Sequence, residues 1–245
     1  MSSTSNPDAV HWTVMTQKDQ AFNWRRFDAY LFDIDGTLLN SRDGVHYNSF
    51  HKALREVYGC NGLIDNVHVH GNTDIGILRA ALVYYGKTSD DFEAHLPRAM
   101  DIMCSDVEQN AGSIHPQLCP SIHELLSYLS SQDKLLGIVT GNLERIGWRK
   151  LERAGLRQFF DFGSFSDRNE RRVDIFRNGL ERARQIRGPK TSVCFVGDTP
   201  NDIDAAAQLG LPVIAVATGI YSREELLHHQ PPFCVSCATE LLESH

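Results

Sequence analysis

Several features that would place this chain outside the ordinary globular enzymes are missing from its 245 residues. No apolar run approaches the roughly 20 residues that cross a bilayer. The polar segment Met1 to Asp8 shows no basic-then-apolar leader. Acidic residues outnumber basic ones, 31 to 24, and the two signs are mixed, so no nucleic-acid footprint is visible. We therefore expect a cytoplasmic protein that binds neither nucleic acid nor a membrane.

Cysteine motifs for metal or redox chemistry are nearly absent as well. Among six cysteines, Cys234 and Cys237 form a single C-x-x-C, and no second pair accompanies it. One such pair is weak evidence for a zinc or redox site. The simpler interpretation is that alternate residues of a short terminal strand point inward. Whether this pair binds anything is left open.

The apolar residues that are present, 42% of the chain, suffice for a substantial core. Their spacing alternates between short continuous runs and helical stripes. This alternation predicts an α/β fold with a parallel sheet covered on both faces. The runs predict strands at 30–32, 134–139, 162–165, 192–197 and 212–217.

Residues 41–119 interrupt this alternation. Three apolar stripes with helical spacing follow one another there, the first ending at Gly59, the second opened by Thr73 and the third starting behind Ser89. They predict a helical insert between the first two strands of the sheet. Residues 1–27 precede the alternation and form an N-terminal extension. Its aromatic residues suggest packing on another surface, and they are Trp12, Phe22, Trp24 and Phe27.

Two carboxylates, Asp33 and Asp35, directly follow the first predicted strand. Carboxylates at the end of a buried strand are costly unless positive charge is close. A metal ion, bound together with a phosphate, would supply that charge. Asp33, Thr140 and Asp198 each end a predicted parallel strand, and such ends share one edge of the sheet. We therefore expect these three residues in one crevice. The alternative is that Asp-Gly-Thr only makes a turn.

In their order these motifs resemble those of the haloacid dehalogenase superfamily of phosphatases and related hydrolases. The Asp-x-Asp-Gly-Thr segment at 33–37 is similar to its first motif, the strand ending at Thr140 to its second, and residues 193–202 to its fourth. The nearest resemblance is to the phosphoglycolate-phosphatase-like branch. It implies a Rossmann-like core, formed by 28–40 and 120–245, and an inserted α-helical cap at 41–119.

The resemblance also assigns roles to the carboxylates. Asp33 would be the nucleophile of an aspartyl-phosphate mechanism, and Asp35 would serve as general acid and then general base. Mg²⁺ would be held by Asp33, Asp198 and the backbone carbonyl of Asp35. Asp202 is expected in a supporting position rather than as a direct ligand.

Phosphate contacts are expected from short segments after the first two strands of the core. Thr140 would donate its hydroxyl to a phosphate oxygen, and the amides of Gly141 and Asn142 would open a helix whose N-terminus favours anions. Alternatively, Thr140 only caps that helix. Gly36 and Thr37 offer further backbone donors near Asp33.

A lysine is missing where the resemblance places the third motif, at 166–176. A cation is still needed beside the nucleophile, and arginine can supply charge but not a proton. Arg172, directly ahead of an apolar stripe, is the first choice, Arg168 is the second, and Arg171 remains open. An arginine cluster that is wholly on the surface is the alternative.

These observations predict a Mg²⁺-dependent phosphatase that hydrolyses a small phosphorylated metabolite, as a monomer or a homodimer. His46, Asn48 and the turn at 71–74 belong to the cap side and are candidates for contacting the leaving group. The rival interpretations are a phosphomutase, phosphonatase or dehalogenase of the same fold, or a catalytically idle binding module on this scaffold.

Overall fold

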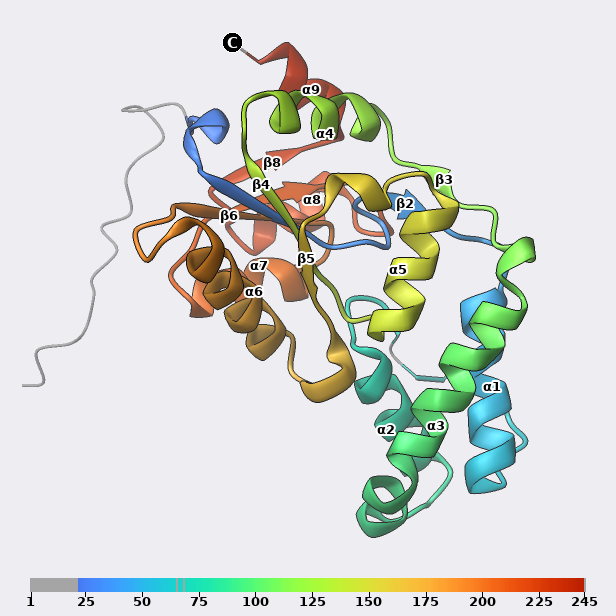
Figure 1. Ribbon diagram of the computed structural model, residues 1–245. Coiled ribbons are helices and arrows are strands. Elements are labelled where there is room, and N and C mark those ends of the chain that lie inside the picture. The colour runs from blue at the N-terminus through green and yellow to red at the C-terminus, as the bar shows by residue number, and fades with distance from the viewer. Residues whose placement is uncertain (1–21, 65, 68, 245) are drawn as a thin grey trace, which may run out of the picture.

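The computed structural model describes residues 22–64, 66–67 and 69–244. Its centre is a parallel sheet with the strand order β5-β4-β1-β6-β7-β8 (Figure 1). Each apolar run predicted as a strand contains one, so the predicted parallel sheet is confirmed. The six strands are β1 (Ala29–Phe32), β4 (Leu135–Val139), β5 (Phe162–Ser164), β6 (Val193–Gly197), β7 (Val213–Val216) and β8 (Phe233–Val235).

Both faces of the sheet are buried, and β1 shows how one strand serves both. Tyr30 and Phe32 belong to one apolar cluster, whereas Ala29 and Leu31 belong to another. Successive side chains of a strand point to opposite faces, so β1 reads as a continuous apolar run. Helices α4 (Ile122–Ser131) and α9 (Ala238–Glu243) cover the first face. The second is covered by α6 (Arg172–Arg187), α7 (Pro200–Gln208) and α8 (Arg223–His228).

The C-x-x-C pair divides between two elements. Cys234 lies on β8 and is buried, whereas Cys237 lies beyond the strand, as the N-cap residue of α9. The expectation that both residues alternate along one strand is therefore wrong for Cys237, because the strand ends at Val235. Both cysteines are free thiols.

The described end of the N-terminal segment belongs to the core. Trp24 and Phe27 are buried in the cluster beneath α4 and α9, and Phe22 packs against it. The Trp24 indole Nε1 donates to Ser244 Oγ at 3.0 Å, which ties this segment to the C-terminal end. The packing expected of these aromatic residues is therefore present for Phe22, Trp24 and Phe27. Trp12 lies outside the described residues.

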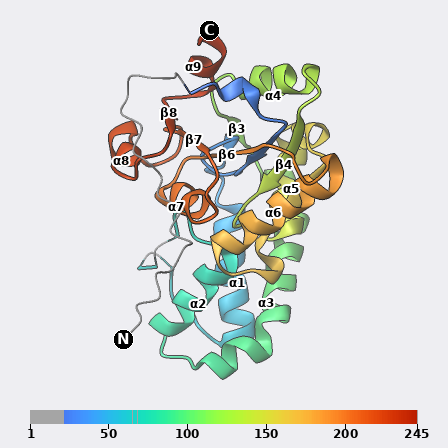
Figure 2. The ribbon, with the colours of Figure 1, turned by 90° about the vertical axis from the view of Figure 1, so that its left-hand side faces the viewer.

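Three helices between β1 and β4 form the inserted helical unit, which Figure 2 shows below the sheet. They are α1 (Val45–Tyr58), α2 (Asp74–Tyr84) and α3 (Ser89–Gln109). Gly59 ends α1 in the left-handed conformation, and the Thr73 side chain caps α2, both as predicted. Helix α3 differs, because Thr88 rather than Ser89 caps it. The short strands β2 (Leu39–Asn40) and β3 (Gln117–Leu118) pair where the chain enters and leaves this unit.

The helical unit has its own apolar cluster, and helix α5 (Glu144–Arg153) contributes to it. Ile146 of α5 and the preceding Leu143 are buried among side chains of α1, α2 and α3. The helices therefore rest on α5 rather than forming an isolated bundle.

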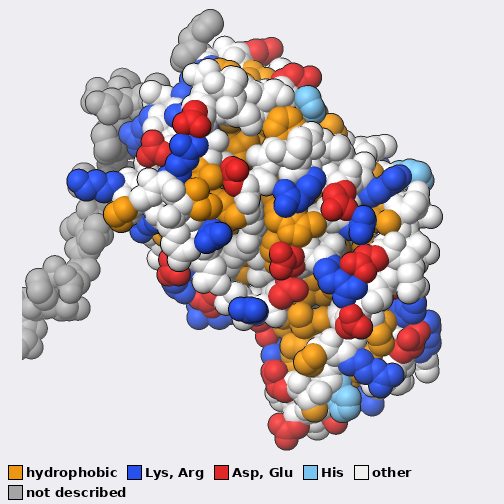
Figure 3. Space-filling view, in the orientation of Figure 1, with side chains coloured by type: hydrophobic (Ala, Val, Ile, Leu, Met, Phe, Trp, Pro, Cys, Tyr) orange, Lys and Arg blue, Asp and Glu red, His pale blue; other side chains and the backbone are white. Residues whose placement is uncertain are grey.

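The longest helix, α3, has 21 residues but includes many charged ones, and none of the described helices combines the length and apolarity of a span. Acidic and basic side chains are interspersed over the face in Figure 3.

The anchoring of the N-terminal segment predicts a stability effect. Trp24→Ala should lower the free energy of unfolding by about 3–5 kcal/mol, because the side chain is 3% exposed and leaves a cavity. Val83→Ala, at a position that is 70% exposed, is the control and should change it by less than about 0.5 kcal/mol. Urea unfolding followed by circular dichroism measures both. Equal stabilities of the two variants would show that residues near Trp24 do not support the core.

Candidate active site

The register of the three central strands brings remote residues together. Phe32 of β1 aligns with Ile138 of β4 on one side and with Val196 of β6 on the other. The residues just beyond these strands, Asp33, Thr140 and Asp198, therefore lie at one edge of the sheet, as expected from the sequence. The chain adds β4 and β5 on one side of β1 and then crosses through α6 to β6 on the other side. Open α/β sheets bind ligands where the strand order reverses in this way.

Three buried carboxylates form the centre of the site. Asp33, Asp198 and Asp202 offer oxygens that lie within 4.8 Å of one another. They are 5%, 3% and 0% exposed. The Arg172 guanidinium contacts two of them, with Nη2 at 2.5 Å from Asp33 Oδ2 and Nε at 2.7 Å from Asp202 Oδ1. One buried cation at the start of α6 thus contacts two of the three negative groups, and Asp198 has no contact with it.

The pKa values reflect this imbalance of charge. Burial raises the pKa of Asp33 to about 6, although Arg172 opposes the shift, and the charge of Asp202 adds to it. Burial also raises the pKa of Asp198, followed by repulsion from Asp202 and Asp33. A divalent cation would favour the ionised carboxylates, so the donor set fits a hard metal ion such as Mg²⁺.

Two glycines leave room for Asp198. A Cβ atom on Gly36 would lie 2.1 Å from Asp198 Oδ2, and one on Gly219 would lie 1.8 Å from it. Gly36 also has a φ of +82°, which disfavours other residues. The opposite oxygen, Oδ1, accepts a hydrogen bond from Thr37 Oγ1 at 2.9 Å. The carboxylate is therefore fixed by Thr37 and confined by the two glycines.

Asp202 is engaged through both of its oxygens. Oδ2 accepts from the Thr199 amide at 3.0 Å and from its hydroxyl at 2.7 Å in a capping box, while Oδ1 takes Arg172. These contacts agree with a supporting position. Helix α7 begins at Pro200, two residues ahead of Asp202, because Thr199 is its N-cap residue.

The helix after β4 begins later than the sequence predicted. Helix α5 begins at Glu144 with Leu143 as N-cap, so Gly141 and Asn142 do not open it and Thr140 does not cap it. The Thr140 hydroxyl bonds to Asp33, which lowers the pKa of that carboxyl relative to burial alone. The chain bends at Gly141 and Asn142, and the Gly141 carbonyl accepts a hydrogen bond from the Asp74 amide of the helical unit at 2.8 Å.

The backbone donors predicted near the nucleophile are occupied within their own turn. The Gly36 amide donates to the Leu39 carbonyl at 2.8 Å, and the Thr37 amide donates to the Ile34 carbonyl at 3.3 Å. In this conformation they bind the turn rather than a ligand. Their contribution to phosphate binding stays a prediction.

The candidate arginines separate clearly. Arg172 reaches Asp33, whereas the Arg171 side chain is 72% exposed and contacts Asp174 at 3.9 Å. Arg168 ends a short 3₁₀ turn and lines a different groove, together with Arg171. The structure therefore places Arg172 at the acidic cluster and leaves the other two outside it.

A lysine that the motifs did not indicate, Lys150 of α5, also reaches the site. Its Nζ lies 2.7 Å from Asp35 Oδ2, and the side chain is 4% exposed. Burial alone would raise the pKa of Asp35, but the Lys150 ammonium brings it below its ordinary value. The signal was present in the sequence, because Lys150 shares the apolar face of its helix with Ile146 and Ala154. A lysine on such a face needs a buried partner.

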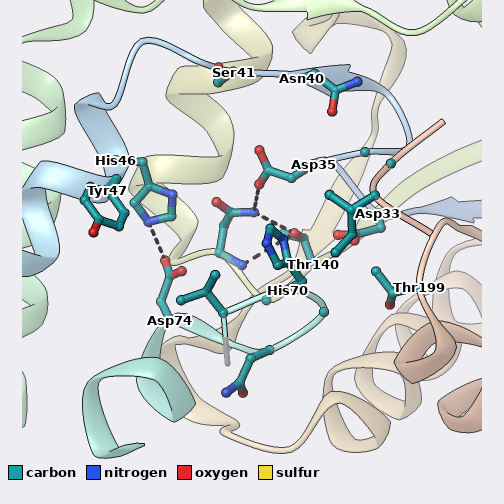
Figure 4. A pocket seen from close by; sticks show the side chains of 18 of the residues that line it. Asp33, Asp35, Asn40, Ser41, His46, Tyr47, His70, Asp74, Thr140 and Thr199 are labelled. Carbon is teal, nitrogen blue, oxygen red and sulfur yellow. Dashed lines mark hydrogen bonds and ion pairs between the residues drawn. The ribbon is translucent and has the colours of Figure 1, made fainter. Parts of the chain in front are cut away.

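The site contains a cavity of about 480 Å³, which is the size of a small-molecule site. The core residues that line it include Asp33, Asp35, Thr140, Lys150, Arg172 and Asp198. Figure 4 shows His46, Tyr47 and His70 of the helical unit facing Asp33 and Asp35 across it. Gly71, Asn72 and Asp74 of the predicted turn also line the cavity, whereas Asn48 does not.

Hydrogen bonds and ion pairs attach the helical unit to the core. Asp74 Oδ2 accepts from the Leu143 amide at 2.8 Å and contacts His46 Nε2 at 3.2 Å. Arg79 Nε donates to both carboxylate oxygens of Glu170, at 2.8 and 2.9 Å. The cavity therefore lies between the helical unit and the core, which these contacts hold together.

Comparison with known proteins gives a consistent result. Residues 30–216 match the family model of the haloacid dehalogenase-like hydrolases. A phosphoglycolate phosphatase of Vibrio vulnificus is 28% identical over 86% of this chain and 93% of its own length. One from Synechococcus elongatus is 30% identical over 56% of this chain, and the match spans 65% of that relative, slightly under two thirds. The crystal structure of CbbY from Rhodobacter sphaeroides with phosphate superimposes with a TM-score of 0.67 at 19% identity, covering 88% of this chain and 96% of CbbY.

The glycines around Asp198 predict a local steric effect. Gly219→Ala should lower the free energy of unfolding by about 1–3 kcal/mol, because its Cβ would overlap Asp198. Gly112→Ala is the matched control, since nothing lies within 4 Å of its Cβ. Urea unfolding measures both variants. If they are equally stable, the loop at Gly219 yields and the confinement of Asp198 is not real.

Proposed function

The chain belongs to the haloacid dehalogenase-like hydrolase family, and on this basis we propose that it is a Mg²⁺-dependent phosphatase acting on a small phosphorylated metabolite through an aspartyl-phosphate on Asp33. The observation that carries the proposal is the buried cluster of Asp33, Asp198 and Asp202, in which Arg172 contacts Asp33 and Asp202. Phosphate-monoester hydrolysis has a very high uncatalysed barrier, and concentrated fixed charge is suited to lowering it.

Mg²⁺ would be held by the Asp33 and Asp198 carboxylates and the backbone carbonyl of Asp35. The ion, when bound, would neutralise charge on the phosphate and on the carboxylates. Asp202 supports the site by holding Arg172 and by capping α7. Arg172 keeps Asp33 in place and supplies the cation that the missing motif lysine would otherwise provide.

Two proton transfers and two displacements complete the proposed reaction. An Asp33 oxygen bonds to phosphorus while the bond from phosphorus to the leaving oxygen breaks, and Asp35 gives that oxygen a proton. Asp35 then takes a proton from water, whose oxygen displaces Asp33 and releases phosphate. Splitting the reaction in this way replaces one difficult step by two easier ones. The Thr140 hydroxyl bonds to Asp33 here, and we propose that it turns to a phosphate oxygen when substrate binds.

The enclosed cavity supports a small substrate. Its 480 Å³ are bounded by the helical unit, which leaves little space for a macromolecule in this conformation. Phosphoglycolate, which the names of the two relatives indicate, is the first candidate. The phosphonatase alternative requires a lysine of the helical unit in the cavity. Lys52 instead pairs with Asp106 at 2.7 Å, and neither Lys52 nor Lys87 lines the cavity.

Substitution of the acidic cluster tests the proposal. The wild type should hydrolyse para-nitrophenyl phosphate with Mg²⁺ and lose this activity with EDTA. Asp33→Asn should lower kcat by roughly 10³-fold or more, since the nucleophile is lost. Asp198→Asn should raise the Mg²⁺ concentration at half-maximal rate by about tenfold or more, because even outer partners of a metal contribute 10–100-fold. Full turnover of Asp33→Asn would end the aspartyl-phosphate proposal.

The two neighbouring arginines provide a second test. Arg172→Gln should reduce kcat by about 10²-fold or more, because it removes fixed positive charge beside Asp33. Arg171→Gln changes the same residue type at the adjacent, exposed position and should stay within about twofold of wild type. Steady-state rates with para-nitrophenyl phosphate compare them. Similar losses in both variants would contradict the assignment of Arg172.

A further inference from the structure

A buried lysine uses all of its hydrogen-bond donors on the proposed proton-transfer residue and one neighbouring side chain. Lys150 Nζ contacts Asp35 Oδ2 at 2.7 Å and Oδ1 at 2.9 Å, and it donates to Asn142 Oδ1 at 2.8 Å. A lysine ammonium has three N–H donors, so these contacts use all of them. Lys150 lies in the second half of α5, and its side chain is 4% exposed.

Asp35 is held from one side and open on the other. Asn142 Nδ2 donates to Asp35 Oδ2 at 2.8 Å and to Thr140 Oγ1 at 2.8 Å, which ties the carboxylate to the end of β4. The Asp35 side chain is nevertheless 44% exposed and lines the cavity. A carboxylate has about four acceptor positions. Lys150 and Asn142 occupy three, and the remaining capacity on Oδ1 is available toward the cavity.

The two carboxylates of the first motif contact separate cations. Arg172, from α6, contacts Asp33 and Asp202. Lys150, from α5, contacts Asp35. Burying an ammonium is costly, and a single well-placed partner repays it only in good geometry. Here the partner is a half-exposed, cavity-lining carboxylate, so the arrangement orients Asp35 as much as it satisfies Lys150.

We infer that Lys150 is the positioning residue of Asp35: together with Asn142 it holds the carboxylate so that Oδ1 faces the leaving oxygen of the substrate. The inference rests on the proposed function, because it concerns the proton that Asp35 gives to the leaving oxygen and the one it takes from water. Lys150 itself gives and takes no proton. Displacements of about 1 Å in such a group reduce rates strongly.

Lys150→Met removes the ammonium at nearly constant volume, and Lys150→Gln keeps a polar head in case the methionine variant does not fold. Arg149→Met is the control on the same helix, since Arg149 pairs at 2.7 Å with the half-exposed Glu152. All variants should retain the Mg²⁺-induced increase in Tm of the wild type, which shows an intact fold and acidic cluster.

The substrates are phosphoglycolate, whose alkoxide needs a proton to leave, and para-nitrophenyl phosphate, whose phenolate does not. With phosphoglycolate, both lysine variants should lose about 10²-fold in kcat with KM within about threefold, while Arg149→Met is unchanged. With para-nitrophenyl phosphate the first step stays fast and hydrolysis of the intermediate becomes slow. Stopped-flow should then show a para-nitrophenol burst near one equivalent per site, the kinetic mark of an accumulating covalent intermediate.

A double-substitution cycle decides whether Lys150 acts through Asp35. If it does, Lys150→Met combined with Asp35→Asn is as slow as Asp35→Asn alone, because the positioned group is already gone. Independent, multiplicative losses would overturn the inference. So would kcat values equal to those of Arg149→Met, or an increase confined to KM, which would make Lys150 a substrate ligand.

Failure of the proposed function gives a different result. A wild type without Mg²⁺-dependent turnover of either substrate would remove the phosphatase proposal and this inference together. A wild type active on para-nitrophenyl phosphate, with lysine variants that show no burst, would remove the role of Lys150 alone.

Discussion

Negative charge concentrated at the carboxyl ends of β1 and β6 is the constraint on which the rest of this structure depends. Asp33, Asp198 and Asp202 are almost entirely buried, and this burial, together with repulsion from neighbouring carboxylates, raises the pKa of the first two. Such a cluster costs stability unless cations and hydrogen bonds offset it. Arg172, the Thr37 hydroxyl and the Thr199 capping box supply part of that compensation, and the negative charge that remains fits a cation.

Each of the two carboxylates of the first motif contacts a different positively charged side chain. Arg172 enters from the start of α6 and holds the proposed nucleophile, whereas Lys150 enters from α5 and holds Asp35. Two carboxylates that are two residues apart on one turn are thereby placed in different environments. Burial raises the pKa of Asp33, whereas Lys150 brings the pKa of Asp35 below its ordinary value and so favours the ionised form that takes a proton from water.

The helical unit completes the site by enclosing it. Its turn at 71–74 lies against both neighbouring strand ends, with the Asp74 amide on Gly141 and the Asn201 side chain on the Gly71 carbonyl at 2.7 Å. Gly141 permits this approach, because a Cβ there would lie 2.5 Å from the Asn72 carbonyl oxygen. The helical unit is thus linked by hydrogen bonds to the segments that follow β4 and β6.

The sequence alone determined the layered sheet, because β1, β4 and β6 are buried on both faces and must be continuously apolar, and their ends place Asp33, Thr140 and Asp198 together. It also identified the three helices of the insert, whose caps at Thr73 and Gly59 are local signals. Only the tertiary structure decided which arginine meets Asp33, since Arg168, Arg171 and Arg172 have the same chemistry and differ only in where the start of α6 points them. Lys150 likewise depended on the fold, because its partner Asp35 is 115 residues away along the chain and no local pattern records their contact.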